Sequence, residues 1–162
     1  MNRAYKSLFE SFKWARNNTV ELFESAHQND ILGYLPNYKN DPRKNRNVLY
    51  QFQCILTTTS TRIRRLKGDS NQKFGILTTP QETLKKTDIP SSLINQILLS
   101  QITELEQVLK PLRDYKTNVM LNLSSLLCHE YLHQGQLVTM FRETGVSFPE
   151  EFDKSWDLSG QT

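Results

Sequence analysis

The chain of 162 residues has the length and composition of one globular domain, with 37% hydrophobic and 23% charged residues. No apolar run approaches the ~18–20 residues that a membrane-spanning helix needs, so we expect no membrane partner. The first six residues lead into a charged amphipathic segment and not into the apolar core of a signal peptide. The two cysteines are therefore expected to be reduced thiols, and the sequence predicts a cytoplasmic location.

The net charge of +3 is unevenly distributed along the chain. Residues 1–80 carry 13 Lys and Arg against 6 Asp and Glu, whereas residues 81–162 carry 7 against 11. The densest basic cluster closes a predicted helix, where cations compensate the negative end of the helix dipole. It consists of Arg62, Arg64, Arg65 and Lys67. We interpret it as a solvated helix end and predict no nucleic-acid partner, although an anionic small substrate would suit it.

A first long amphipathic helix is predicted over about residues 4–28. Apolar or small residues recur there every three or four positions, as one buried helix face requires. These positions are Tyr5, Leu8, Phe9, Phe12, Ala15, Thr19, Val20, Phe23 and Ala26. A loop rich in helix breakers follows at residues 33–40.

The second helix is predicted to start at Asp41-Pro42 and to end at Gly68. Aspartate suits the N-cap, proline suits the first turn, and glycine suits the left-handed stop after the last turn. The buried stripe of this helix is Val48, Leu49, Phe52, Ile55, Leu56, Thr59, Ile63 and Leu66. Residues 69–87 show no regular period.

Two further helices are predicted in the second half of the chain. The third begins at 88–92 and stops at Pro111, because proline clashes with the preceding turn. Its expected buried stripe is Leu93, Ile97, Leu98, Ile102, Leu105, Val108 and Leu109. The last helix begins near 114–118 and continues to about Thr144, with Gly145 as its stop, and the aromatic tail at 146–156 is expected to pack back on the bundle.

Four amphipathic helices of roughly 20–30 residues with little strand signal predict an all-α protein, a four-helix bundle formed by a single domain over residues 1–162. The long connection between the second and third helices allows a crossover in place of a simple up-down-up-down path.

Two of the three histidines, His129 and His133, are four residues apart in the last predicted helix. Residues at i and i+4 lie one turn apart on one face, so both imidazoles can reach one metal ion. With Glu130 the pair also matches H-E-x-x-H, the motif of zinc metallopeptidases in which the glutamate activates the bound water. Such an enzyme needs a third ligand, for which Glu150, Glu151 or Asp153 have workable spacing, but no upstream strands are predicted to hold a peptide.

The same helix resembles the C-terminal helix of the DinB-like superfamily, a group of small four-helix bundles. The resemblance rests mainly on residues 129–137, followed by Arg142-Glu143-Thr144-Gly145 and Pro149. In outline it extends over the chain, through Trp14 and Asn17 in the first helix, Leu66-Lys67-Gly68 and the tail from Pro149 to Trp156. It implies a divalent ion, zinc or nickel, held by His129, His133 and a third histidine from the second helix. It also implies a homodimer, and an S-transferase or hydrolase that uses a small-molecule thiol such as bacillithiol or mycothiol.

The second helix contains no histidine, so the third ligand has to be of another type. Counting back from Leu66 and Gly68 places it near Gln53 or Cys54, with Gln51 as a further alternative. We favour Gln53, which borders the buried stripe, because Cys54 is expected to point away from that stripe. An amide oxygen is a poorer donor to zinc or nickel than imidazole, and the change should cost at least roughly 1.4–2.7 kcal/mol of binding free energy.

The sequence thus predicts a metal site formed by His129, His133 and Gln53, which is degenerate in its third ligand. The leading hypothesis is a metal-dependent thiol transferase or hydrolase. The alternative is a stress-associated binding module that has lost the metal and has no enzymatic activity.

Overall fold

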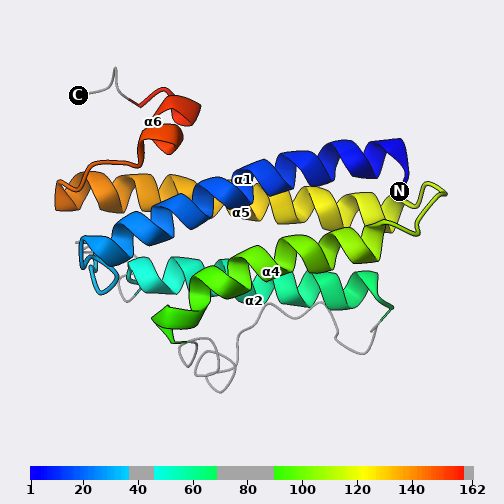
Figure 1. Ribbon diagram of the computed structural model, residues 1–162, viewed down its shortest axis with the longest axis horizontal. Coiled ribbons are helices and arrows are strands. Elements are labelled where there is room, and N and C mark those ends of the chain that lie inside the picture. Colours follow the sequence, from blue (N-terminus) through cyan, green and yellow to red (C-terminus); the bar gives the residue numbers. More distant parts are fainter. Residues whose placement is uncertain (37–45, 69–89, 159–162) are drawn as a thin grey trace.

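The computed structural model describes residues 1–36, 46–68 and 90–158. Over these residues the chain forms helices and no strand, which confirms the all-α prediction. The helices are α1 (Arg3–Gln28), α2 (Val48–Leu66), α4 (Ser91–Leu109), α5 (Thr117–Thr144) and α6 (Glu150–Trp156) (Figure 1). No helix in this part of the chain combines the length and the apolar character that crossing a membrane requires.

The four long helices pack side by side, and each of them has two close neighbours. Both α1 and α2 contact α4 and α5, while α1 and α2 lie diagonally opposite and barely touch. Helices α1 and α5 run in the same direction, and α2 and α4 run together in the opposite direction (Figure 1). Parallel α2 and α4 require a crossover between them, which the long connection allows, so the bundle does not follow an up-down-up-down path.

The helix ends follow the predicted signals with one change. Gly68, two residues after the end of α2, and Gly145, directly after α5, have positive φ of 91° and 72°. Helix α2 begins at Val48, and its N-cap is Asn47, whose side chain accepts a hydrogen bond from the Tyr50 amide. The predicted start at Asp41-Pro42 lies outside the described residues.

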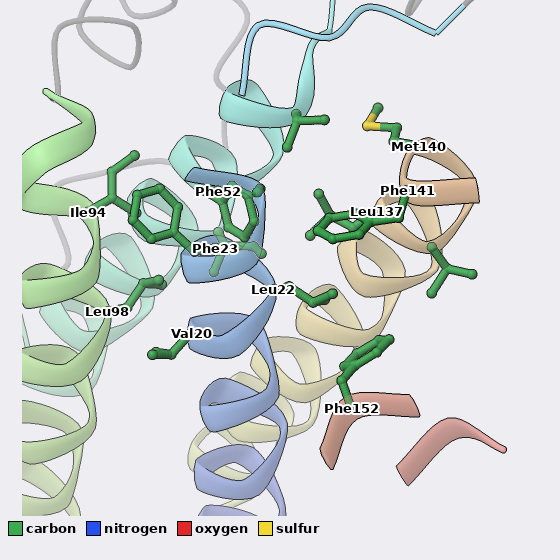
Figure 2. Close-up of a cluster of buried hydrophobic side chains, with 14 of the residues drawn as sticks. Val20, Leu22, Phe23, Phe52, Ile94, Leu98, Leu137, Met140, Phe141 and Phe152 are labelled. Atoms are coloured by element: carbon green, nitrogen blue, oxygen red, sulfur yellow. The ribbon is translucent and has the colours of Figure 1, made fainter. Parts of the chain in front are cut away.

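The C-terminal tail packs back on the bundle, as expected. Helix α6 contacts α1, and the ring of Phe152 is completely buried. Phe152 lies between Phe148 and Trp156, with ring centroids 5.9 and 5.5 Å away. Phe152 belongs to the same buried cluster as Leu137 and Phe141 (Figure 2).

The buried stripe of α4 contains the predicted Leu98, Ile102, Leu105 and Leu109 and differs from the prediction at the start of the helix. Leu93, which was expected in the core, is 44% exposed, and its neighbour Ile94 is fully buried. The polar Gln101 also faces inward. Apolar side chains on both flanks of this helix left its inward face ambiguous, and on the face that is buried Gln101 accepts a hydrogen bond from Arg16.

The core consists of two hydrophobic clusters at opposite ends of the bundle. One, drawn in Figure 2, joins the end of α1 and the start of α2 to the last turns of α5 and to α6. The other joins the start of α1 to the end of α4 and the start of α5. Between them lies a set of buried polar side chains, here called the polar layer: Arg16, Thr19, Thr59, Gln101, Glu130 and Gln134.

Candidate metal centre

Helix α2 presents a polar face to α5 at the level of the polar layer. Gln51, Cys54 and Thr58 are spaced by three and four residues, so they lie on one side of the helix. Each of them contacts a histidine of α5. The antiparallel course of the two helices pairs Gln51 with His133 and Thr58 with His129.

The two histidines converge on one point, as their spacing predicted. The Nε2 atoms of His129 and His133 are 3.2 Å apart, and the rings stand nearly perpendicular at 71°. His133 is buried and His129 is half-buried, so the pair lies within the α2–α5 interface. Both side chains therefore point toward α2 and not into bulk solvent.

Cys54 approaches this histidine pair, contrary to the expectation that it points away. Its Sγ atom is 3.8 Å from His129 Nε2. Among the described residues, Cys54, His129 and His133 form a group in which one ligand atom from each lies within 4.8 Å of the others. The sequence argument chose Gln53, at the border of the buried stripe, whereas the histidines contact the side of α2 that carries Gln51, Cys54 and Thr58.

The distances in this group suit a tetrahedral metal ion. Metal–nitrogen bonds of about 2.05 Å and a metal–sulfur bond of about 2.3 Å hold two nitrogens ~3.3 Å apart and a nitrogen and a sulfur ~3.6 Å apart. The observed separations are 3.2 Å between the two Nε2 atoms and 3.8 Å between His129 Nε2 and Cys54 Sγ. The third separation, between the ligand atoms of Cys54 and His133, is within 4.8 Å. One cysteine and two histidines are donors that zinc prefers, so these three residues fit such an ion.

Two glutamines of α2 were considered as the third ligand. Gln51 places its Oε1 atom 2.7 Å from Nδ1 of His133, on the opposite side of the ring from Nε2. It therefore contacts the histidine from behind and does not face the point where the two Nε2 atoms meet. Gln53 is 2% exposed and lies beside Cys54 on the same helix, and its assignment as a ligand stays a prediction.

Glu130 points into the bundle interior and binds Arg16. Its two carboxylate oxygens accept hydrogen bonds from Nε and Nη2 of Arg16, each at 2.9 Å. Thr19 donates a third bond to the same carboxylate at 2.6 Å. The side chain is 1% exposed and does not belong to the group of potential ligands, so its carboxylate is held away from the role that a peptidase glutamate plays.

Two of the three acidic residues of the tail are also engaged elsewhere. Glu150 and Glu151 both accept hydrogen bonds from Lys154 on the surface of α6. The H-E-x-x-H motif in the sequence therefore does not correspond to a peptidase site, because none of these glutamates belongs to the group of potential ligands.

The pKa values of two groups on α2, Tyr50 and Arg62, are shifted by their surroundings. Burial raises the pKa of the Tyr50 phenol, and the interaction with Cys54 raises it further, while the nearby Arg46 lowers it. Burial and the nearby Arg65 lower the pKa of Arg62, whose guanidinium donates to Asn122 at 3.1 Å. The polar contact between α2 and α5 thus continues from the histidines toward the end of α2.

Comparison of the chain with family models, with curated proteins and with solved structures gave no match. The class of protein that the fold and the site define is a helical bundle in which a cysteine and two histidines lie close enough to hold a metal ion.

Proposed function

We propose that this protein binds a divalent transition-metal ion, zinc in the first place, through Cys54, His129 and His133. The observation that carries the proposal is the convergence of one sulfur and two nitrogens at separations close to those around a tetrahedral ion. Two of the three donors come from one helix and the third from its neighbour, so the folded bundle brings them together before an ion binds.

We further propose that the protein is a DinB-like bundle. The sequence resemblance and the all-helical architecture support this, and so does the position of the third donor on the second long helix. The difference is that a cysteine takes the place of the family's third histidine. A thiolate adds a negative charge and a softer donor, which favours zinc over nickel relative to a three-imidazole site.

The activity that we propose is a thiol transfer or a hydrolysis on a small molecule in the cytoplasm. Three protein donors leave one coordination position of a tetrahedral ion for a water or a thiol, whose pKa the ion would lower as a Lewis acid. The half-buried Thr58 hydroxyl is 3.3 Å from His129 Nε2, so it can donate a hydrogen bond to a group that enters beside this ring. As in the resemblance, a homodimer is expected.

Metal analysis of untagged protein tests this function first. We expect about one zinc per chain after purification, and a cobalt-substituted protein should show the sulfur-to-cobalt charge-transfer band of a thiolate ligand. Cys54→Ser should abolish that band and weaken binding at least ~100-fold, since it removes a ligand and not only a neighbour of one. Cys128→Ser is the matched control, because Cys128 is exposed and lies outside the group.

The outcomes separate an enzyme from the alternative without activity. Absence of bound metal under replete conditions would reject the metal site and leave a stress-associated binding module. Stoichiometric metal without conversion of a panel of thiol conjugates and esters would reject the enzymatic part alone.

A further inference from the structure

The contact between Gln51 and His133 is buried at both ends. Oε1 of Gln51 is 2.7 Å from Nδ1 of His133, and the two side chains are 2% and 4% exposed. The amide oxygen can only accept a hydrogen bond, so Nδ1 of this ring must carry the proton. In a neutral imidazole the other nitrogen then has the free lone pair.

This arrangement determines which atom of His133 is able to bind an ion. Its Nε2 atom, left as an acceptor, faces Nε2 of His129 at 3.2 Å. Without an acceptor behind the ring, the proton could occupy either nitrogen, and a buried N–H would lose its hydrogen bond. The Gln51 contact therefore keeps the lone pair on the side where the three potential ligands converge.

The position of Gln51 on the helix adds a geometric constraint. It lies three residues before Cys54, so one turn of α2 carries both the sulfur donor and the acceptor behind His133. A rotation of α2 would move the two together and would break both contacts with α5. The same turn of α2 thus controls both the position of Cys54 and the orientation of the His133 ring.

We propose that Gln51 is a positioning residue of the metal centre, which fixes the tautomer and the orientation of His133 by accepting the Nδ1 proton. The inference rests on the proposed metal-binding function and names a residue outside the ligand set. Its neutral amide takes the place that a carboxylate or a backbone carbonyl often has behind a zinc-bound histidine. A neutral acceptor donates less electron density to the ring than a carboxylate, so it leaves the ion a stronger Lewis acid.

The first measurement uses the protein without added metal. Long-range proton–nitrogen NMR of the histidine rings should show His133 in the Nδ1-protonated tautomer. It should show His129 protonated at Nε2, since that atom faces the acceptor nitrogen of His133. In Gln51→Met, which keeps the length of the side chain but removes the acceptor, His133 should lose its single tautomer. A His133 that is protonated at Nε2 in the wild type would overturn the proposal.

The second measurement is the affinity for cobalt and zinc, read from competition with a chelator. Gln51→Met should bind about 10–100-fold more weakly, whereas Gln51→Glu, which restores an acceptor oxygen, should recover most of the loss. Equal affinity of Gln51→Met and the wild type would overturn this inference while the metal site stands. A wild type that binds neither metal would overturn both, and circular dichroism of each variant confirms that the bundle is folded.

Discussion

Arg16 and Glu130 form a two-point ion pair in the interior of the bundle, where neither side chain is more than 1% exposed. The remaining donors of the guanidinium reach the other two long helices, through Gln101 at 2.7 Å and Thr59 at 2.7 Å. A single arginine of α1 thus contacts α2, α4 and α5. Because a charge in such a place is stable only with its partners, the pair fixes how the four helices are rotated.

Removing one member of this pair should destabilise the protein strongly. Glu130→Gln leaves the Arg16 charge buried without its counter-ion, and we expect a loss of about 3–5 kcal/mol in the free energy of unfolding. Urea denaturation measures it. The control is Glu104→Gln, which removes the exposed partner of Lys67 and should cost no more than about 1 kcal/mol. Equal effects of the two substitutions would contradict the role assigned to the buried pair.

Replacing both members by apolar residues should cost less than removing one. The double variant Arg16→Met with Glu130→Leu leaves no uncompensated charge, and its stability should be closer to that of the wild type than either single variant. Metal affinity provides a second readout. If the polar layer orients α5, the double variant should bind zinc more weakly although it is folded.

The assignment of the α2 ligand can be tested with two adjacent residues. If Cys54 is the donor, Gln53→Met should leave zinc affinity within about threefold of the wild type, and Cys54→His should retain a bound ion with the relative preference moved toward nickel. Competition titrations with both metals measure this. Loss of binding in Gln53→Met with full binding in Cys54→Ser would instead support the glutamine that the sequence favoured.

Stability should rise when Glu21 is neutralised. Burial first, then repulsion from Glu151 and Glu24, raises the pKa of Glu21 above its ordinary value. The folded state therefore binds the proton more tightly than the unfolded state, and stability falls as the pH rises from the ordinary pKa through the raised one. Glu21→Gln should increase the melting temperature at pH 7, and the difference should vanish at a pH below the ordinary value of 4.5. An equal gain at both pH values would contradict this explanation.

Substitution of the glycine after α5 should destabilise the protein. Gly145 has φ of 72°, in a region that side chains with a Cβ atom disfavour, and no atom within 4 Å would contact an added Cβ. Gly145→Ala should therefore destabilise by about 1 kcal/mol through backbone strain alone. Gly145→Asn should cost less, since asparagine tolerates this conformation better than alanine, and thermal unfolding separates the two.

Most of the fold could be predicted from the sequence, because it depends on the periodicity of apolar residues and on residues that end helices. The apolar repeats from Tyr5 to Ala26 predicted α1 to within one residue at each end of its range. Gly145 and Pro111 marked helix ends by backbone chemistry that does not depend on tertiary contacts. The start of α2 was misplaced because its cap, Asn47, is less conspicuous than Asp41-Pro42.

Only part of the candidate site could be predicted from the sequence, because its composition depends on which sides of two helices meet. Spacing alone placed His129 and His133 on one face. It could not give the rotation of α2 against α5, which decides between Cys54 and its neighbours. The ion pair of Arg16 was missed for the same reason, although one charged residue between Ala15 and Thr19 on an inward-facing turn is a signal that could have pointed to it.

The location of the histidines beside the polar layer has a consequence for ion preference. The orientation of α5 is held from the α1 side by Arg16, whereas the donor that completes the site comes from α2 on the other side. A substitution at position 54 can therefore alter the chemistry offered to an ion while the imidazoles stay where they are. In the proposed metal site, a change of this one donor would therefore change which ion is preferred without rebuilding the rest of the bundle.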